Sequence, residues 1–182
     1  MPKSQIPYQV IRSARKTISI QITADGDILV RCPTRMGSAD IQKFVDSKAP
    51  WIEKHLSRQA AQPELPPLTP DQLHALAQQA LAVIPQRVAH FASRMGVTYG
   101  RITIRNQRTR WGSCSGKGNL NFNCLLMLVP PEVLDYVIVH ELCHRKEMNH
   151  SPAFWAQVEK ILPDYKQRQK WLKENGSSLI RR

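Results

Sequence analysis

The sequence predicts an α+β protein in which small β-sheets pack against helices. Two segments, residues 8–33 and 97–128, alternate apolar and polar side chains as half-buried strands do. Two others, residues 38–56 and 69–95, repeat apolar residues at the helical period. A fifth segment, after Pro130-Pro131, is apolar on most sides from Val133 to Val139, which is typical of a deeply buried helix.

Composition limits the class of protein. The chain has 182 residues, 42% of them hydrophobic, which is enough for one domain or two small ones with real cores. No apolar run reaches the length of a membrane span, so we expect no membrane partner and a cytoplasmic location. The four cysteines form no C-x-x-C pair, which favours reduced thiols over a disulfide framework or zinc finger.

The first predicted element is a β-hairpin near the N-terminus. Ile18, Ile20 and Ile22 alternate with polar residues, the alternation resumes after residue 27, and Asp25-Gly26 between them is a hairpin turn signal. We therefore expect an antiparallel hairpin or meander over residues 8–33.

A helix is expected next, with Ser38 as its cap and Pro50 kinking it or splitting it in two. Four prolines then fall within residues 63–70, a composition typical of a stiff linker. The sequence therefore predicts two domains, a β-rich region with a helix over residues 1–61 and a second domain over residues 62–182.

The second domain begins with a long predicted helix. Thr69 or Asp71 can cap it, Gly96 is a stop signal, and Pro85 should bend it. The alternating segment that follows, up to Leu128, predicts a small mixed or antiparallel sheet.

The buried helix that begins after Pro130 carries a metal-binding pattern, His140-Glu141-Leu142-Cys143-His144. Four residues advance a helix by slightly more than one turn, so both imidazoles face the same way and can share one metal ion at about 2.0–2.1 Å. Glu141 cannot easily bind the same ion, but its carboxylate can reach the attacking water and serve as general base.

A catalytic zinc ion needs a third protein ligand. Glu147 lies too far along the helix axis if the helix continues to Asn149, as we expect. His150 is favoured, because Ser151-Pro152 begins another helix and places His150 in the reversal between the two. Glu159 on that following helix is the alternative. The predicted cofactor is one Zn²⁺ ion.

Four sequence segments also resemble the YgjP-like metallopeptidase family, which is related to the SprT-type zincins. They are Arg110-Trp111-Gly112-Ser113-Cys114-Ser115, Gly118-x-Leu120-Asn121, the stretch from Asp135 to His144, and Asn149-His150-Ser151-x-x-Phe154-Trp155. The Asp25-Gly26 turn, Arg31-Cys32-Pro33 and Trp51-Ile52 extend the resemblance over nearly the whole chain. It implies a minimal zincin-like catalytic core and a zinc-dependent hydrolase, with His140, His144 and His150 as ligands and Glu141 as base. It implies no particular substrate.

Other residues have both a functional and a structural interpretation. Arg110 and Asn121, on strands expected to border the cleft, can polarise a scissile carbonyl or phosphoryl oxygen, or simply close hydrogen bonds within the sheet. Cys114 can be a thiol near the metal or a small buried apolar residue. Tyr136, one turn before His140, can donate to an oxyanion or pack in the core.

Three functions remain open from the sequence. The first is a zinc peptidase that holds a peptide along an edge strand within residues 101–123. The second is a hydrolase of phosphorylated small molecules such as nucleoside triphosphates, held by the basic cluster Arg101, Arg105, Arg108 and Arg110. The third is a DNA-associated protein, for which the net charge of +12 is suitable.

Overall fold

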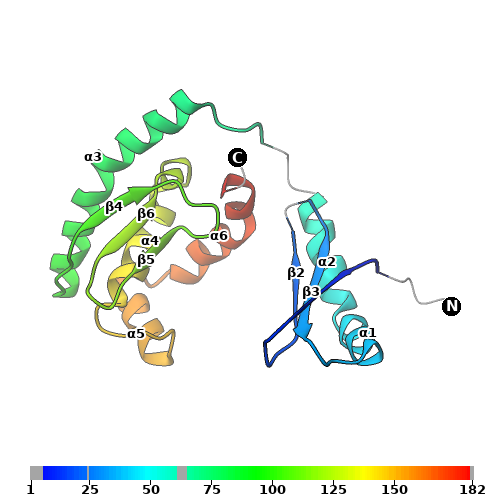
Figure 1. Ribbon diagram of the computed structural model, residues 1–182. Coiled ribbons are helices and arrows are strands. Elements are labelled where there is room, and N and C mark those ends of the chain that lie inside the picture. The colour runs from blue at the N-terminus through cyan, green and yellow to red at the C-terminus, as the bar shows by residue number, and fades with distance from the viewer. Residues whose placement is uncertain (1–5, 24, 61–64, 181–182) are drawn as a thin grey trace. The chain divides into compact units, whose positions relative to one another are not determined.

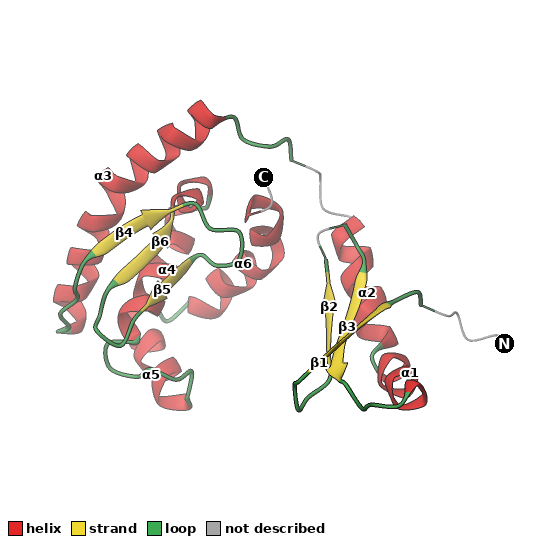
Figure 2. Ribbon diagram, in the orientation of Figure 1, coloured by secondary structure: helices red, strands yellow, loops and turns green. Residues whose placement is uncertain are grey.

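The computed structural model describes residues 6–23, 25–60 and 65–180, and the chain divides into two compact units, Met1–Pro63 and Glu64–Arg182 (Figure 1). The domain boundary expected between residues 61 and 62 lies outside the described residues. Each unit contains one small sheet with helices against it, so the predicted α+β class is confirmed (Figure 2).

The N-terminal sheet has the order β1-β3-β2, with β1 at Gln9–Ser13, β2 at Ser19–Ile22 and β3 at Ile28–Pro33. The hairpin of β2 and β3 was predicted, and Gly26 has the positive φ of 87° that its turn requires. The meander was wrong, because β1 pairs with β3 in parallel. Strand β3 holds the central place, and its inward residues Ile28, Val30 and Cys32 are apolar and buried.

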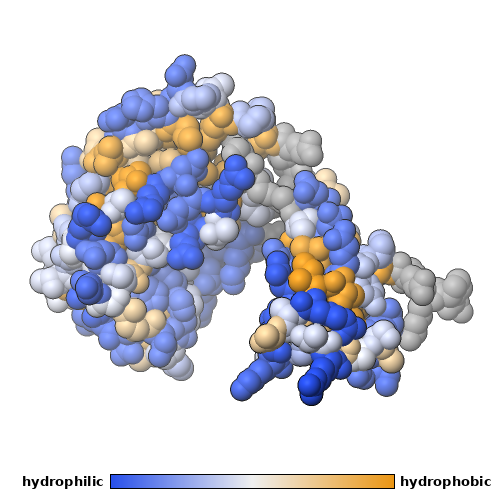
Figure 3. All heavy atoms as spheres, viewed as in Figure 1, coloured by the Kyte–Doolittle hydropathy of each residue, from blue (hydrophilic) through white to orange (hydrophobic). Residues whose placement is uncertain are grey.

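Two helices, α1 (Ser38–Ser47) and α2 (Ala49–Ala60), share this unit's core through Ile41, Val45 and Ile52. The helix is split at Lys48, two residues before Pro50, as expected. Ser38 is the first helical residue and not the cap, because Gly37 holds the extended cap position. On the face seen in Figure 3, apolar residues gather over β2 and β3, with hydrophilic residues around them.

The second unit begins with α3 (Pro70–Met95), and both of its predicted ends are confirmed. Thr69 and Gln72 form a capping box at the start, and Gly96 ends the helix in the left-handed conformation with φ of 62°. Pro85 lies inside α3, which continues through it as one helix.

The second sheet is mixed and has the order β4-β6-β5, with β4 at Ile102–Arg105, β5 at Gly112–Cys114 and β6 at Leu120–Asn123. Strand β6 pairs in parallel with β4 and antiparallel with β5. The prediction of strand structure up to Leu128 was wrong for its last five residues, because Cys124–Leu128 form a 3₁₀-helix, η1. The buried Asn123 side chain accepts a hydrogen bond from the Leu125 N–H and so caps η1.

Helix α4 (Pro131–Cys143) is the centre of the second unit, and it contacts α3, β5, α5 (Pro152–Ile161) and α6 (Tyr165–Ile180). Nine of its residues are buried, among them the run Val137–Val139, as the sequence predicts. The helix ends at Cys143 and not at Asn149, since His144 takes the cap position. No sequence pattern predicted α6.

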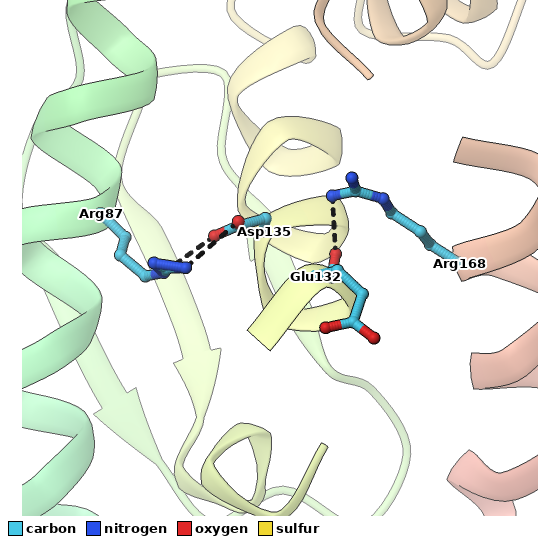
Figure 4. A network of polar contacts seen from close by, with 4 residues as sticks. All are labelled: Arg87, Glu132, Asp135 and Arg168. Atoms are coloured by element: carbon cyan, nitrogen blue, oxygen red, sulfur yellow. Dashed lines mark hydrogen bonds and ion pairs between the residues drawn. The ribbon is translucent and has the colours of Figure 1, made fainter. Parts of the chain in front are cut away.

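Polar contacts fasten α4 to the helices on two sides, as Figure 4 shows. From α3, Arg87 donates to both carboxylate oxygens of Asp135, at 2.9 and 3.2 Å. From α6, Arg168 donates to the backbone oxygen of Glu132 at 3.0 Å. The helix that carries the histidines is thereby held at its N-terminal half.

A membrane-spanning helix was not expected, and no described helix combines the required length with the required hydropathy.

Candidate metal centre

Three imidazoles converge at the end of α4. His140 lies in its last turn, His144 is its C-terminal cap and His150 follows in the turn before α5. One ligand atom from each lies within 4.8 Å of the other two. The Nε2 atoms of His140 and His150 are 3.0 Å apart. Two nitrogens bound to one tetrahedral zinc ion would be about 3.3 Å apart, so the observed separation is close to that of two ligands.

Hydrogen bonding and burial leave these imidazoles suited to a cation. The Nδ1 atom of His144 lies 3.1 Å from the backbone oxygen of Glu147, which places the ring proton on Nδ1 and leaves the Nε2 lone pair free. Burial and the two neighbouring imidazoles lower the pKa of His140 to about 3, and burial also lowers the pKa of His144. Both rings are therefore neutral near pH 7 and can donate lone pairs.

One aromatic side chain, Phe154, packs against all three imidazoles. The Phe154 side chain is fully buried, and its ring centroid lies 4.9 Å from that of His140, 4.7 Å from that of His144 and 4.8 Å from that of His150. The Ser151 hydroxyl caps α5 by accepting from the Phe154 N–H, so the same turn orders His150 and Phe154. The helix cap predicted from Ser151-Pro152 therefore helps to position one of the three imidazoles and the aromatic ring that contacts all three.

Glu141 is buried beside strand β5. Burial raises the pKa of its carboxyl to about 7, against the opposing effects of the Arg110 guanidinium charge and a hydrogen bond from the Cys114 backbone N–H. A carboxyl with a pKa near neutrality can both accept and release a proton at working pH, which is what a general base that later acts as an acid requires.

Three observations bear on whether a metal ion fits. Each of the three imidazoles offers a ring nitrogen within 4.8 Å of the other two, so a cation placed between them could bind all three lone pairs. The neighbouring thiol of Cys143 is buried and is not part of the metal-binding group found among the described residues. The Nδ1 atom of His140 is buried without a hydrogen-bond partner among the described residues. The donor set fits a divalent transition metal.

The structure does not bring every predicted residue to this cluster. Arg110 is exposed, and its charge acts on Glu141. Asn121 points to the sheet face opposite Leu120 and Phe122, where its amide donates to the Ser113 hydroxyl at 3.3 Å. The predicted alternative ligand Glu159 does not belong to the metal-binding group found among the described residues, and neither does Glu147, which was disfavoured from the sequence.

Two other residues weighed from the sequence have local partners. Tyr136 is buried, and its hydroxyl is hydrogen-bonded to Gln169 of α6, which agrees with core packing. Cys114 is half-buried, and burial raises the pKa of its thiol against the Arg145 guanidinium charge beside it. The contribution of the Glu147 backbone oxygen was missed, because the helix was expected to continue through that residue.

The match to known proteins agrees with this geometry. The family model described as YgjP-like, metallopeptidase domain matches residues 16–74 and 71–175, so the chain belongs to the YgjP-like metallopeptidase family. No curated protein matches the chain.

Two solved structures are similar over half of the chain. They are the metallopeptidase zymogens abylysin of Pyrococcus abyssi, at 23% identity and a TM-score of 0.46, and jannalysin of Methanocaldococcus jannaschii, at 20% identity and a TM-score of 0.45. Each match covers 50% of this chain and 94% of the other.

Proposed function

We propose that the protein is a zinc-dependent peptidase whose metal ligands are His140, His144 and His150 and whose general base is Glu141. The convergence of three imidazoles within 4.8 Å, with the pKa of His140 lowered by its burial, carries this proposal. Three protein ligands leave a fourth position open, which is typical of catalytic rather than structural zinc sites. Imidazole also suits nickel, cobalt, copper and iron, so the identity of the metal is part of the proposal.

Zinc supplies a Lewis acid that makes water nucleophilic near neutral pH and polarises a carbonyl oxygen. The protein's own part is proton movement and orientation. Glu141 accepts a proton from the attacking water on its carboxylate and delivers it to the leaving amine nitrogen, so its charge is restored after each cycle. The charge of the exposed Arg110 guanidinium acts on Glu141, and we propose that Arg110 holds substrate oxygen atoms near the carboxylate.

A peptide substrate would pair with β5, an edge strand of its sheet. Strand β5 lies against α4, the helix that contains His140 and Glu141 and is capped by His144, so a peptide along this edge would lie near the cluster.

The test is the Glu141→Gln variant, which keeps the size and most hydrogen bonds of the side chain but cannot accept the proton. We expect one zinc ion per chain and peptide turnover reduced by at least about 100-fold, the lower end of the effect of general-base catalysis. The matched control is Glu159→Gln on α5, an exposed glutamate outside the cluster, which should retain both zinc and activity. Full turnover by a zinc-loaded Glu141→Gln protein would refute the proposed role.

The other two functions predicted from the sequence depend on the basic cluster. Arg101, Arg105, Arg108 and Arg110 are exposed as that idea requires, but no further observation supports phosphorylated substrates or nucleic acid. A nucleotide panel assayed beside the peptide panel separates these substrates, and DNA binding would be recognised by its steep fall with salt.

A further inference from the structure

One position in the second sheet lacks the side chain that its neighbours have. Ile104 of β4 pairs with Phe122 of β6, and Phe122 pairs with Gly112 of β5, so these residues form one row on the same sheet face. The adjacent row on that face is Ile102, Leu120 and Cys114. Leu120 and Phe122 are fully buried, so this face points into the core. Only at Gly112 does the row end without a side chain.

The side chain of Glu141 occupies the space at Gly112. A Cβ atom placed on Gly112 would lie 2.8 Å from both Cγ and Oε1 of Glu141 and 3.1 Å from its Cδ. These distances are shorter than van der Waals contact, so a side chain at residue 112 would collide with Glu141. The Glu141 side chain therefore packs directly against the backbone of β5. Two residues along the same strand, the Cys114 N–H donates to the carboxylate.

The backbone conformation does not explain the glycine. Among the described residues, the glycines with positive φ are Gly26, Gly96 and Gly118, so Gly112 has a backbone that alanine can also adopt. The requirement for glycine at residue 112 is therefore the contact with Glu141.

We propose that Gly112 is a positioning residue for Glu141, because its bare backbone and the Cys114 N–H together form a seat that fixes the carboxylate in one orientation. This inference rests on the proposed role of Glu141 as general base. The seat is rigid because Glu141 contacts it along the chain from Cγ to Oε1, while its own backbone belongs to the buried helix α4.

The C-terminal helix supports the seat from outside. Trp111, the residue before Gly112, lies against Gly176 of α6, where an added Cβ would be 3.1 Å from the indole Nε1. Helix α6 thereby holds the start of β5, and with it the backbone under Glu141.

The test variant is Gly112→Ala, assayed on the full zinc-loaded chain. Its methyl group should displace the carboxylate by about 1 Å, and misplacement of this size lowers kcat by about 100-fold. We expect KM for a peptide and the zinc content to stay unchanged, because the three atoms nearest to the added methyl group all belong to the Glu141 side chain. The matched control is Gly116→Ala, in the turn after β5, where an added Cβ meets nothing within 4 Å and kcat should remain at the parent value.

A double-mutant cycle tests the contact independently of activity. Gly112→Ala should lower Tm by roughly 5 °C, the effect of overpacking in a chain of this size. In a Glu141→Ala background, which has no Cγ or carboxylate to collide with, most of this loss should disappear. An equal Tm loss in both backgrounds, or parent-level kcat in the Gly112→Ala protein, overturns the inference.

The two proposals fail in different ways. If Glu141→Gln is inactive but Gly112→Ala is fully active, the seat is refuted and the general base stands. If Glu141→Gln is fully active while the cycle shows strong coupling, the general base is refuted and the contact between Gly112 and Glu141 stands.

Discussion

Phe154 should control metal affinity although it has no ligand atom, and Phe154→Leu is the change that shows it. Leucine keeps much of the buried volume but removes the ring that contacts all three imidazoles. Each aromatic pair contributes about 0.5–1.5 kcal/mol, so three pairs contribute about 1.5–4.5 kcal/mol to the order of the histidines. Leucine retains part of this through its own contacts.

The expected result is a zinc affinity about 10–100-fold lower than in the parent, the usual effect of losing a residue that supports metal ligands. This corresponds to about 1.4–2.8 kcal/mol. Competition for zinc between the protein and a chelating dye measures it. The free energy of unfolding of the metal-free protein should also fall, by about 1–2 kcal/mol, because a buried ring is replaced by a side chain of different shape.

A matched control separates metal binding from stability. Phe91 of α3 is also buried, at 5% exposure, and its ring contacts are with His90 and Arg94 instead of the metal cluster. Phe91→Leu should lose similar stability and keep the parent's zinc affinity. The reasoning is refuted if Phe154→Leu binds zinc as tightly as the parent, or if both variants lose the same affinity.

Two further predictions concern stability. Arg87→Ala should cost about 1–2 kcal/mol at pH 7, because a largely buried carboxylate loses a two-point partner that is itself partly exposed. Burial raises the pKa of the Asp135 carboxyl, although the Arg87 charge lowers it. Without Arg87 the pKa rises further, so protonation of Asp135 stabilises the folded variant more than the folded parent. The stability difference between the parent and Arg87→Ala should therefore shrink as pH falls from 7 towards 4. Urea unfolding of both proteins at the two pH values measures it, and an equal difference at both would contradict the prediction. Thr69→Ala removes the α3 cap and should cost about 0.5–2 kcal/mol, whereas Thr69→Ser should cost much less in the same measurement.

The sequence could predict features that depend on nearby residues. The spacing of His140 and His144 fixes both on one helix face, and Ser151-Pro152 marks the turn that holds His150. The ends of α3 could be predicted for the same reason, because Thr69 and Gly96 each make their capping hydrogen bonds within one helical turn.

Features that depend on distant partners were not predictable in this way. The parallel pairing of β1 with β3 is decided by which strand is buried most, and no pattern within β1 reveals it. The end of α4 at Cys143 is accompanied by a hydrogen bond between the ring of His144 and the Glu147 backbone, which can form only after the chain has turned. The contact between Gly112 and Glu141 had a weak signal, a glycine at an inward strand position, but its partner lies in another element.

The central claim is that one metal ion is bound by the imidazoles of His140, His144 and His150. X-ray absorption spectroscopy at the zinc edge of the zinc-loaded full chain tests it most directly. The claim predicts three imidazole nitrogens and one oxygen at about 2.0–2.1 Å, with one imidazole fewer in a His150→Ala variant. Sulfur scattering at about 2.3 Å, or an unchanged spectrum in the variant, would contradict it.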